Sequence, residues 1–234
     1  MDKNKVVALL VTLSVFVSPI LWIYRAEILD YFHVESEKES EELSNSSQKK
    51  STIKTSSSKS KSSKSTRSST PSIGKVLDSF NGVDVYENGA VRNVNGRNTT
   101  SDGYNLGLKY QCVEFVKRYY YQVFHHKMPN SYGHAKEFYS IEVSDGEYNS
   151  QRGLTQYKNG SISMPKVNDI LVYGAAPFNE FGHVAIVSKV TEDSVECISQ
   201  NLGQGNGTRR TYALSYANGR WKIDEPYILG WLRK

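Results

Sequence analysis

The 234-residue chain has only two cysteines, and it contains neither a CxxC nor an HExxH pattern. Proteins commonly hold zinc through residues at these spacings, so their absence argues against a metal site. We expect no metal and no other cofactor. The chain also lacks an internal repeat.

Acidic residues are missing from Asn45 to Thr70, where Ile53 is the only large apolar residue. An acidic stretch, Glu35 to Glu42, precedes this tract, and neither stretch can bury enough apolar surface to offset chain entropy. We therefore predict that residues 31–74 form a disordered linker. The simpler interpretation of the Ser/Lys-rich tract is a solvated spacer, and the alternative is electrostatic adhesion to polyanions.

The net charge of +5 comes from this Ser/Lys-rich tract. Its six Lys and one Arg carry +7, which leaves −2 for the rest of the chain. The rest has no basic patch with interleaved aromatic residues, so the sequence indicates no nucleic-acid partner.

Long apolar runs are absent except for one, from Val6 to about Tyr24, which has about the ~20 residues that cross a bilayer as a helix. A cleaved signal peptide, the alternative, would have a shorter apolar core and a small-x-small site, which this run does not offer. We therefore predict an uncleaved membrane anchor, or signal-anchor, in residues 1–30. Lys3 and Lys5 favour a cytoplasmic amino end, so a single pass would place residues 75–234 outside the cell.

Residues 75–234 suit a single domain. A helix from Cys112 to about His126 and a short one over Ala135–Tyr139 precede a run of strands, which predicts an α+β fold with an antiparallel sheet. The expected strands are Asp84–Tyr86, Ile170–Tyr173, His183–Val190, Val195–Gln200, Arg210–Ser215 and Tyr227–Leu232.

Cys112 lies at the predicted start of the first helix, on its apolar face with Val116 and Tyr119. Unpaired backbone N–H groups and the positive end of the helix dipole favour thiolate over thiol at this place. Cys112 is therefore a candidate nucleophile. The alternative is a small buried hydrophobic residue at a helix start.

A partner for this cysteine follows in the chain, because His183 begins one predicted strand and Asn201 ends the next. This order of cysteine, histidine and polar residue is typical of papain-like thiol hydrolases. The segments around them are Tyr110–Phe115, Asn168–Tyr173, Phe181–Val187 and Ser199–Asn201. In this order they resemble the CHAP family (cysteine, histidine-dependent amidohydrolases/peptidases), in particular the branch with glutathionylspermidine amidase and bacterial-surface relatives.

The resemblance implies a papain-like fold with helices packed on an antiparallel sheet. It implies that Cys112 attacks an amide carbonyl, that His183 moves the proton, and that Gln111 joins the Cys112 N–H in an oxyanion hole. With the predicted anchor it implies peptidoglycan as substrate, on the cell-wall side of the membrane, with wall polyanions a possible partner of the linker. The alternatives are a glutathionylspermidine-type amidase and an inactive surface-binding module.

The third catalytic position departs from the family, whose strand usually carries Glu-x-Asn where this chain has Ser199-Gln200-Asn201. His183 and Asn201 lie opposite each other if the strands are joined by a three-residue loop, Thr191 to Asp193. We therefore predict that the Asn201 side-chain oxygen accepts a hydrogen bond from His183. In that register Cys197 lies about 13 Å from Asn201, at ~3.3 Å per residue, too far for a disulfide with Cys112, so we expect both thiols to be free.

Overall fold

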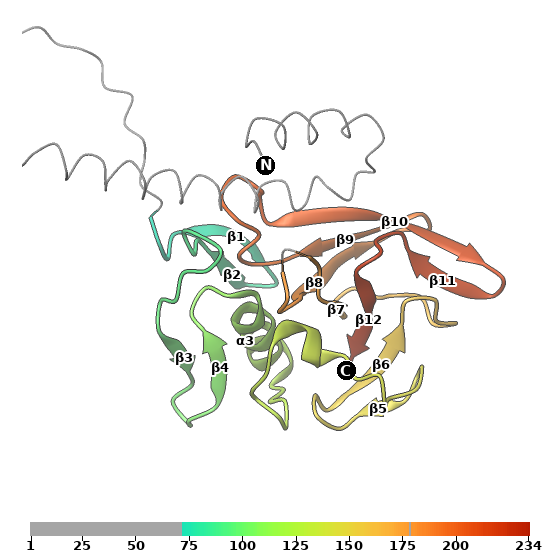
Figure 1. Cartoon of the computed structure of the whole chain (residues 1–234). Helices are drawn as coiled ribbons and strands as arrows, with labels where there is room; N and C mark the ends of the chain where they lie inside the picture. Colours follow the sequence, from blue (N-terminus) through green and yellow to red (C-terminus); the bar gives the residue numbers. More distant parts are fainter. Residues whose placement is uncertain (1–71, 178) are drawn as a thin grey trace, which may run out of the picture.

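The computed structural model describes residues 72–177 and 179–234 (Figure 1). The predicted anchor and nearly all of the predicted linker lie outside these residues. In the part of the chain that is described, no helix is both long and apolar enough to cross a membrane.

The described residues form an eight-stranded sheet, two small hairpins and a single α-helix. The sheet has the order β11-β10-β9-β8-β7-β12-β6-β5, and all its neighbouring strands are antiparallel. The pairs β1-β2 and β3-β4 form the hairpins. The elements are β1 (Val76–Phe80), β2 (Val83–Tyr86), β3 (Arg97–Thr99), β4 (Asn105–Leu108), α3 (Cys112–Phe124), the 3-10 helix η2 (Ala135–Phe138), β5 (Tyr148–Asn149), β6 (Leu154–Lys158), β7 (Ile170–Tyr173), β8 (His183–Val190), β9 (Ser194–Ile198), β10 (Arg209–Ala217), β11 (Arg220–Ile223) and β12 (Ile228–Arg233).

The predicted α+β class with an antiparallel sheet is confirmed. Helix α3 begins at Cys112 as predicted, and β7 and β8 have the predicted bounds. The sequence missed β1, β3, β4, β5, β6 and β11, most of which are short or have few apolar residues at alternate positions. The second expected helix, over Ala135–Tyr139, is the 3-10 helix η2, so α3 is the only α-helix in the described residues.

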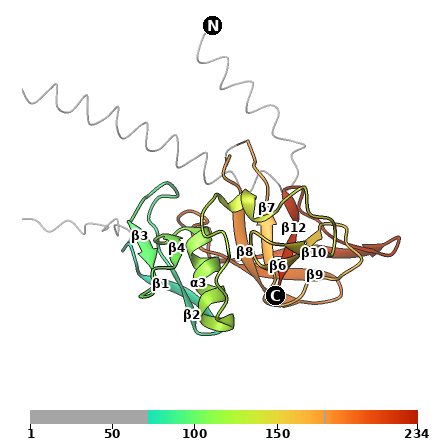
Figure 2. The same cartoon turned by 90° about the horizontal axis from the view of Figure 1, so that it is seen from below.

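The large sheet has an apolar core on each face, because side chains of a strand alternate between faces. Val184 and Ile186 of β8 pack with Phe115 and Val116 of α3. Ala185 and Val187 of the same strand point to the opposite face and join a second cluster with Trp231. Seen from below, α3 runs alongside β8, with the β1-β2 hairpin on its other side (Figure 2).

The polar side of α3 is buried as well as its apolar side. Glu114, Lys117 and Arg118 are all at most 6% exposed, because the β3-β4 hairpin and the segments around it cover them. Gly107 of β4 allows this close approach, since a Cβ there would lie 3.3 Å from the Glu114 Cα. Helix α3 is therefore enclosed by packing, with its amino end at the edge of the sheet where β8 begins.

Candidate active site

The thiol of Cys112 lies among backbone N–H groups at the start of α3. No side chain caps this helix end. The N–H groups of Cys112, Val113 and Val184 donate to the sulfur and lower the thiol pKa, but burial has the larger effect and raises it to about 11. Loss of solvation thus outweighs the N–H groups and the helix dipole, and this balance favours the thiol over the predicted thiolate in the resting protein.

His183 is the first residue of β8 and lies directly opposite Tyr173 in the ladder with β7. Its ring nitrogen Nε2 is buried and has no hydrogen-bond partner. Burial, aided by the positive charge of Arg210, lowers the pKa of His183 from 6.5 to about 4. The imidazole is therefore neutral at physiological pH and can accept a proton.

The structure brings the thiol of Cys112 to the beginning of β8, the strand that starts at His183. The N–H that the Cys112 sulfur accepts from Val184 belongs to the residue that follows His183. The thiol therefore lies against the backbone at the beginning of β8. The thiol and the imidazole are both uncharged in the resting protein, so the proton of Cys112 still belongs to sulfur.

The structure does not place Asn201 where it was predicted. Its Oδ1 accepts from Asn88 Nδ2 at 3.2 Å, and its Nδ2 donates to Gln111 Oε1 at 2.6 Å and to the carbonyl of Val91 at 2.8 Å. Asn201 has a φ of 65°, a left-handed conformation that ends the alternation of side chains along the strand. The predicted hydrogen bond from His183 to Asn201 is therefore wrong.

The strand register near the site agrees with the prediction, although the pairing at the far end of β8 does not. Ile186 pairs with Ile198, as a direct pairing of His183 with Asn201 requires. Residues Thr191 to Asp193 separate β8 from β9 as predicted, but Val190 pairs with Val195 instead of Ser194. A bulge at Ser188 absorbs the difference, and the Ser188 hydroxyl donates to Glu196 Oε1 at 2.7 Å.

Gln111 does not point its amide toward an open oxyanion position. Its Nε2 donates to the carbonyls of Val91 and Asn93 at 3.2 and 2.8 Å. These carbonyls belong to a loop, residues 88–95, in which the buried Asn88 also contacts Asn201. Both Gln111 and Asn201 therefore hold this loop against the start of α3.

Sequence reasoning missed a buried polar network behind the helix start. Glu114 accepts from Arg118 Nε at 2.7 Å, from Gln200 Nε2 at 2.9 Å and from Asn98 Nδ2 at 2.8 Å. Gln200 also donates to the backbone carbonyl of Gln111 at 3.0 Å. The spacing of Glu114 and Arg118, four residues apart on one helix, is the signal that could have found their ion pair.

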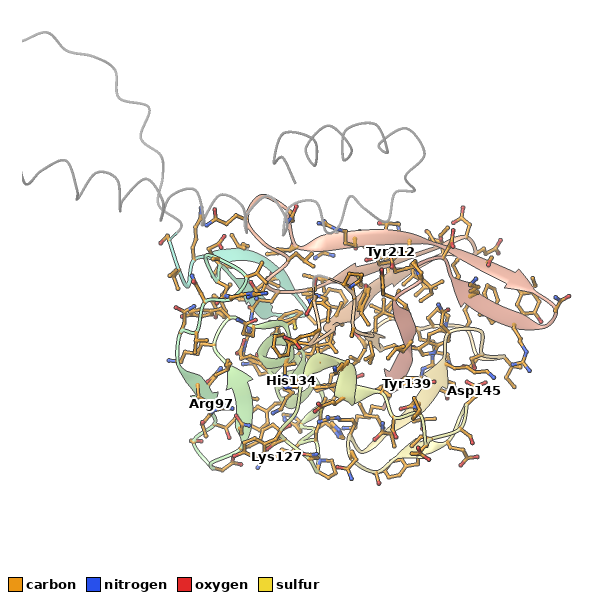
Figure 3. The ribbon with its side chains drawn as sticks, in the orientation of Figure 1. Arg97, Lys127, His134, Tyr139, Asp145 and Tyr212 are labelled. Atoms are coloured by element: carbon orange, nitrogen blue, oxygen red, sulfur yellow. The ribbon has the colours of Figure 1, made fainter. Side chains whose placement is uncertain are left out.

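The two cysteines are both free, which confirms the prediction. Cys197 belongs to the core cluster on the sheet face away from α3. His134, at the start of η2, lies beside Phe181, with ring centroids 4.8 Å apart (Figure 3). Asp169 lies directly before β7, and it also forms a buried ion pair with Arg233 at 2.6 Å. Among residues 72–177 and 179–234, no group of three or more His, Cys, Asp and Glu could hold a metal.

A comparison with protein families matches residues 99–201 to the CHAP domain. The chain contains a CHAP domain. The match begins ahead of Cys112, includes His183 and ends at Asn201. It confirms the family resemblance drawn from the four sequence segments.

Curated relatives are similar to this chain over part of their length. Trypanothione synthetase of Crithidia fasciculata is 24% identical over 161 residues, covering 64% of this chain and 24% of the relative. The bifunctional glutathionylspermidine synthetase/amidase of Escherichia coli (strain K12) is 30% identical over 142 residues, covering 54% of this chain and 22% of the relative. The chain thus spans about a quarter or less of the length of these relatives.

Among solved structures, the crystal structure of Ly7917 is 20% identical, covers 53% of each chain and has a TM-score of 0.32. The CHAP domain and the amidase relative together support a hydrolase of the amidase or peptidase type.

Proposed function

We propose that the protein is a membrane-anchored cysteine amidohydrolase or peptidase that cleaves amide bonds of peptidoglycan outside the cell. The observation that carries the proposal is the position of the Cys112 thiol against the Val184 N–H, one residue from His183, within a CHAP domain. The apolar run from Val6 to Tyr24 supports an anchor, and the Ser/Lys-rich tract supplies a tether through a polyanionic wall.

In the proposed reaction, the Cys112 proton passes to the neutral His183 ring as the sulfur bonds to the amide carbonyl carbon. The carbonyl oxygen takes up negative charge in the same step. His183 returns its proton to the nitrogen as the C–N bond breaks, and the amine leaves. Water, activated by His183, hydrolyses the thioester, which releases a carboxylic acid and restores the thiol.

Backbone groups stabilise the oxyanion in this proposal. The N–H groups of Cys112, Val113 and Val184 donate to the thiol in the resting protein, and no side chain caps the helix end. When the sulfur bonds to carbon, these donors become available to the developing oxyanion. The Gln111 amide is already committed to the 88–95 loop, so its contribution is to hold that loop.

A neutral resting pair affects when the proton moves. With the thiol pKa raised to about 11 and the imidazole pKa lowered to about 4, a free thiolate–imidazolium pair is unfavourable. The proton therefore transfers as the sulfur attacks, when the charge passes on to the oxyanion.

A second candidate function is hydrolysis of a small peptide–amine conjugate. The relative from Escherichia coli is named a glutathionylspermidine synthetase/amidase, which favours this candidate. The same Cys112 and His183 would act on its amide bond. A surface-binding module without hydrolytic activity is the third candidate.

One experiment separates the three candidates. Purified full-length protein is incubated with purified peptidoglycan and, separately, with glutathionylspermidine, and new termini are identified by mass spectrometry. Cys112→Ala should abolish activity, whereas Cys197→Ala, which removes the thiol on the far face of the sheet, should retain it. Cleavage of glutathionylspermidine alone would favour the second candidate, and binding without new termini the third.

A further inference from the structure

The ring nitrogen Nε2 of His183 is buried, and it has no hydrogen-bond partner among the residues that the structure describes. Asn201 directs its oxygen to Asn88, and the side chain of Gln200 is engaged with Glu114 and the Gln111 carbonyl. A histidine that transfers a proton needs a fixed ring orientation. Packing against neighbouring side chains therefore has to fix the orientation of the His183 ring.

Tyr173 is the aromatic neighbour that packs on this ring. It lies directly opposite His183 in the β7-β8 ladder, where cross-strand side chains on one face are in contact. The two ring centroids are 5.6 Å apart and the planes meet at 65°, an edge-on arrangement that aromatic pairs prefer. Tyr173 is therefore placed to limit rotation of the imidazole.

The Tyr173 ring is itself held in place. It is 8% exposed and belongs to the core cluster away from α3. Its hydroxyl donates to the Tyr212 hydroxyl at 3.3 Å and lies 3.5 Å from the Cys197 sulfur. Tyr212 projects from β10 (Figure 3), so a continuous contact runs from β10 through Tyr173 to His183.

The backbone before His183 also presses against Tyr173. Gly182 has a φ of 71°, and a Cβ at this position would lie 2.4 Å from the Tyr173 carbonyl oxygen. Only glycine fits so close to that carbonyl in this conformation. Both the backbone and the ring of His183 are thus set against Tyr173.

We propose that Tyr173 is the positioning residue for His183, where the chain lacks a hydrogen-bonded orienting side chain. The ring of Tyr173 holds the imidazole by edge contact and keeps water from its buried nitrogen. The inference rests on the proposed role of His183 as the proton-transfer group. It assigns the task of the third catalytic residue to an aromatic ring of the neighbouring strand.

The test compares Tyr173→Phe, which keeps the ring, with Tyr173→Leu, which removes it, in the full-length protein. NMR titration of His183 and peptidoglycan hydrolysis are measured for each. In Tyr173→Leu, water should reach Nε2, so the His183 pKa should rise by about one unit or more, and kcat should fall about tenfold or more with KM little changed. Tyr173→Phe should keep kcat within about threefold of the wild type, because the edge contact remains.

Tyr212→Phe is the matched control, because it removes a hydroxyl from the same cluster without a ring contact to His183. It should behave like Tyr173→Phe. If Tyr173→Leu does not melt cooperatively, Tyr173→Met replaces it. A folded ring-deleted variant with wild-type titration and turnover would overturn the proposal, as would equal losses in the Phe and Leu variants. The titration reports on the surroundings of the His183 ring, so it tests the role of Tyr173 even if peptidoglycan is not the substrate.

Discussion

The side chains of Gln111 and Asn201 are hydrogen-bonded to each other, with Asn201 Nδ2 donating to Gln111 Oε1 at 2.6 Å. Both also donate to the carbonyl of Val91. Two residues that the sequence assigns to separate catalytic tasks thus form one hydrogen-bonded unit that fixes the 88–95 loop beside Cys112.

This pair predicts coupled losses of stability. Gln111→Ala and Asn201→Ala should each lower the free energy of unfolding by about 1–2 kcal/mol, because each leaves half-buried polar partners unpaired. Both should also lower turnover, since the loop borders the helix start. The double variant should lose clearly less than the sum of the two single losses. Urea denaturation measures all four proteins. Ser199→Ala is the control, because alanine keeps the backbone N–H that donates to Thr208. Strictly additive losses would show that the pair does not act as a unit.

Alkylation should show that Cys112 is not a preformed thiolate. Burial raises its pKa to about 11, so iodoacetamide should label it at least about tenfold more slowly near pH 7 than it labels an unshifted thiol. The rate should climb as the pH rises toward 11. Labelled peptides are quantified by mass spectrometry with glutathione as the reference thiol. Rapid labelling of Cys112 at neutral pH would restore the thiolate interpretation.

The buried imidazole of His183 predicts sensitivity to acid. Its pKa is lowered from 6.5 to about 4, so between these values the unfolded chain binds a proton that the folded chain does not. The free energy of unfolding should therefore fall as the pH drops from 6.5 toward 4. His183 should account for a loss on the order of 2–3 kcal/mol. Urea denaturation at pH 4.5 and 7 should show a smaller drop in His183→Asn than in the wild type. His134→Asn, which changes an exposed histidine, is the control. Identical drops in all three proteins would contradict the assignment.

The Glu114 network should be among the most costly polar sites to disrupt. Glu114→Ala leaves the Arg118 guanidinium buried without its carboxylate, which should cost about 3–5 kcal/mol of unfolding free energy. Asp102→Asn is the matched control, because it breaks the exposed ion pair with Lys127 and should cost far less unfolding free energy. Thermal and urea unfolding compare the two variants. Similar small losses would mean that the buried pair contributes little.

The apolar run from Val6 to Tyr24 should remain on the mature protein, with the CHAP domain outside the cell. Protease added to intact cells should release the domain by cutting within the Ser/Lys-rich tract, which has lysines and no expected fold. The released fragment is identified by its N-terminal sequence. Free protein in the medium that begins near residue 25 would instead indicate a cleaved signal peptide.

The sequence by itself determined the elements that carry the two candidate catalytic residues. Apolar residues at helical spacing after a Gly- and Asn-rich loop predicted that α3 begins at Cys112, and a β-branched run predicted that β8 extends from His183 to Val190. These signals are local, because each element's own side chains set its period and its end. The segments around them were also enough to identify the family.

Only the tertiary structure decided how these residues are surrounded. The position of the Asn201 side chain and the capture of Gln111 by the 88–95 loop depend on partners far away in the chain. Burial of Cys112 likewise comes from packing of several segments, and it reverses the pKa shift that the helix start alone predicts. Desolvation sums over neighbours that no local pattern specifies, so the charge state of the site follows from the fold and not from the motif.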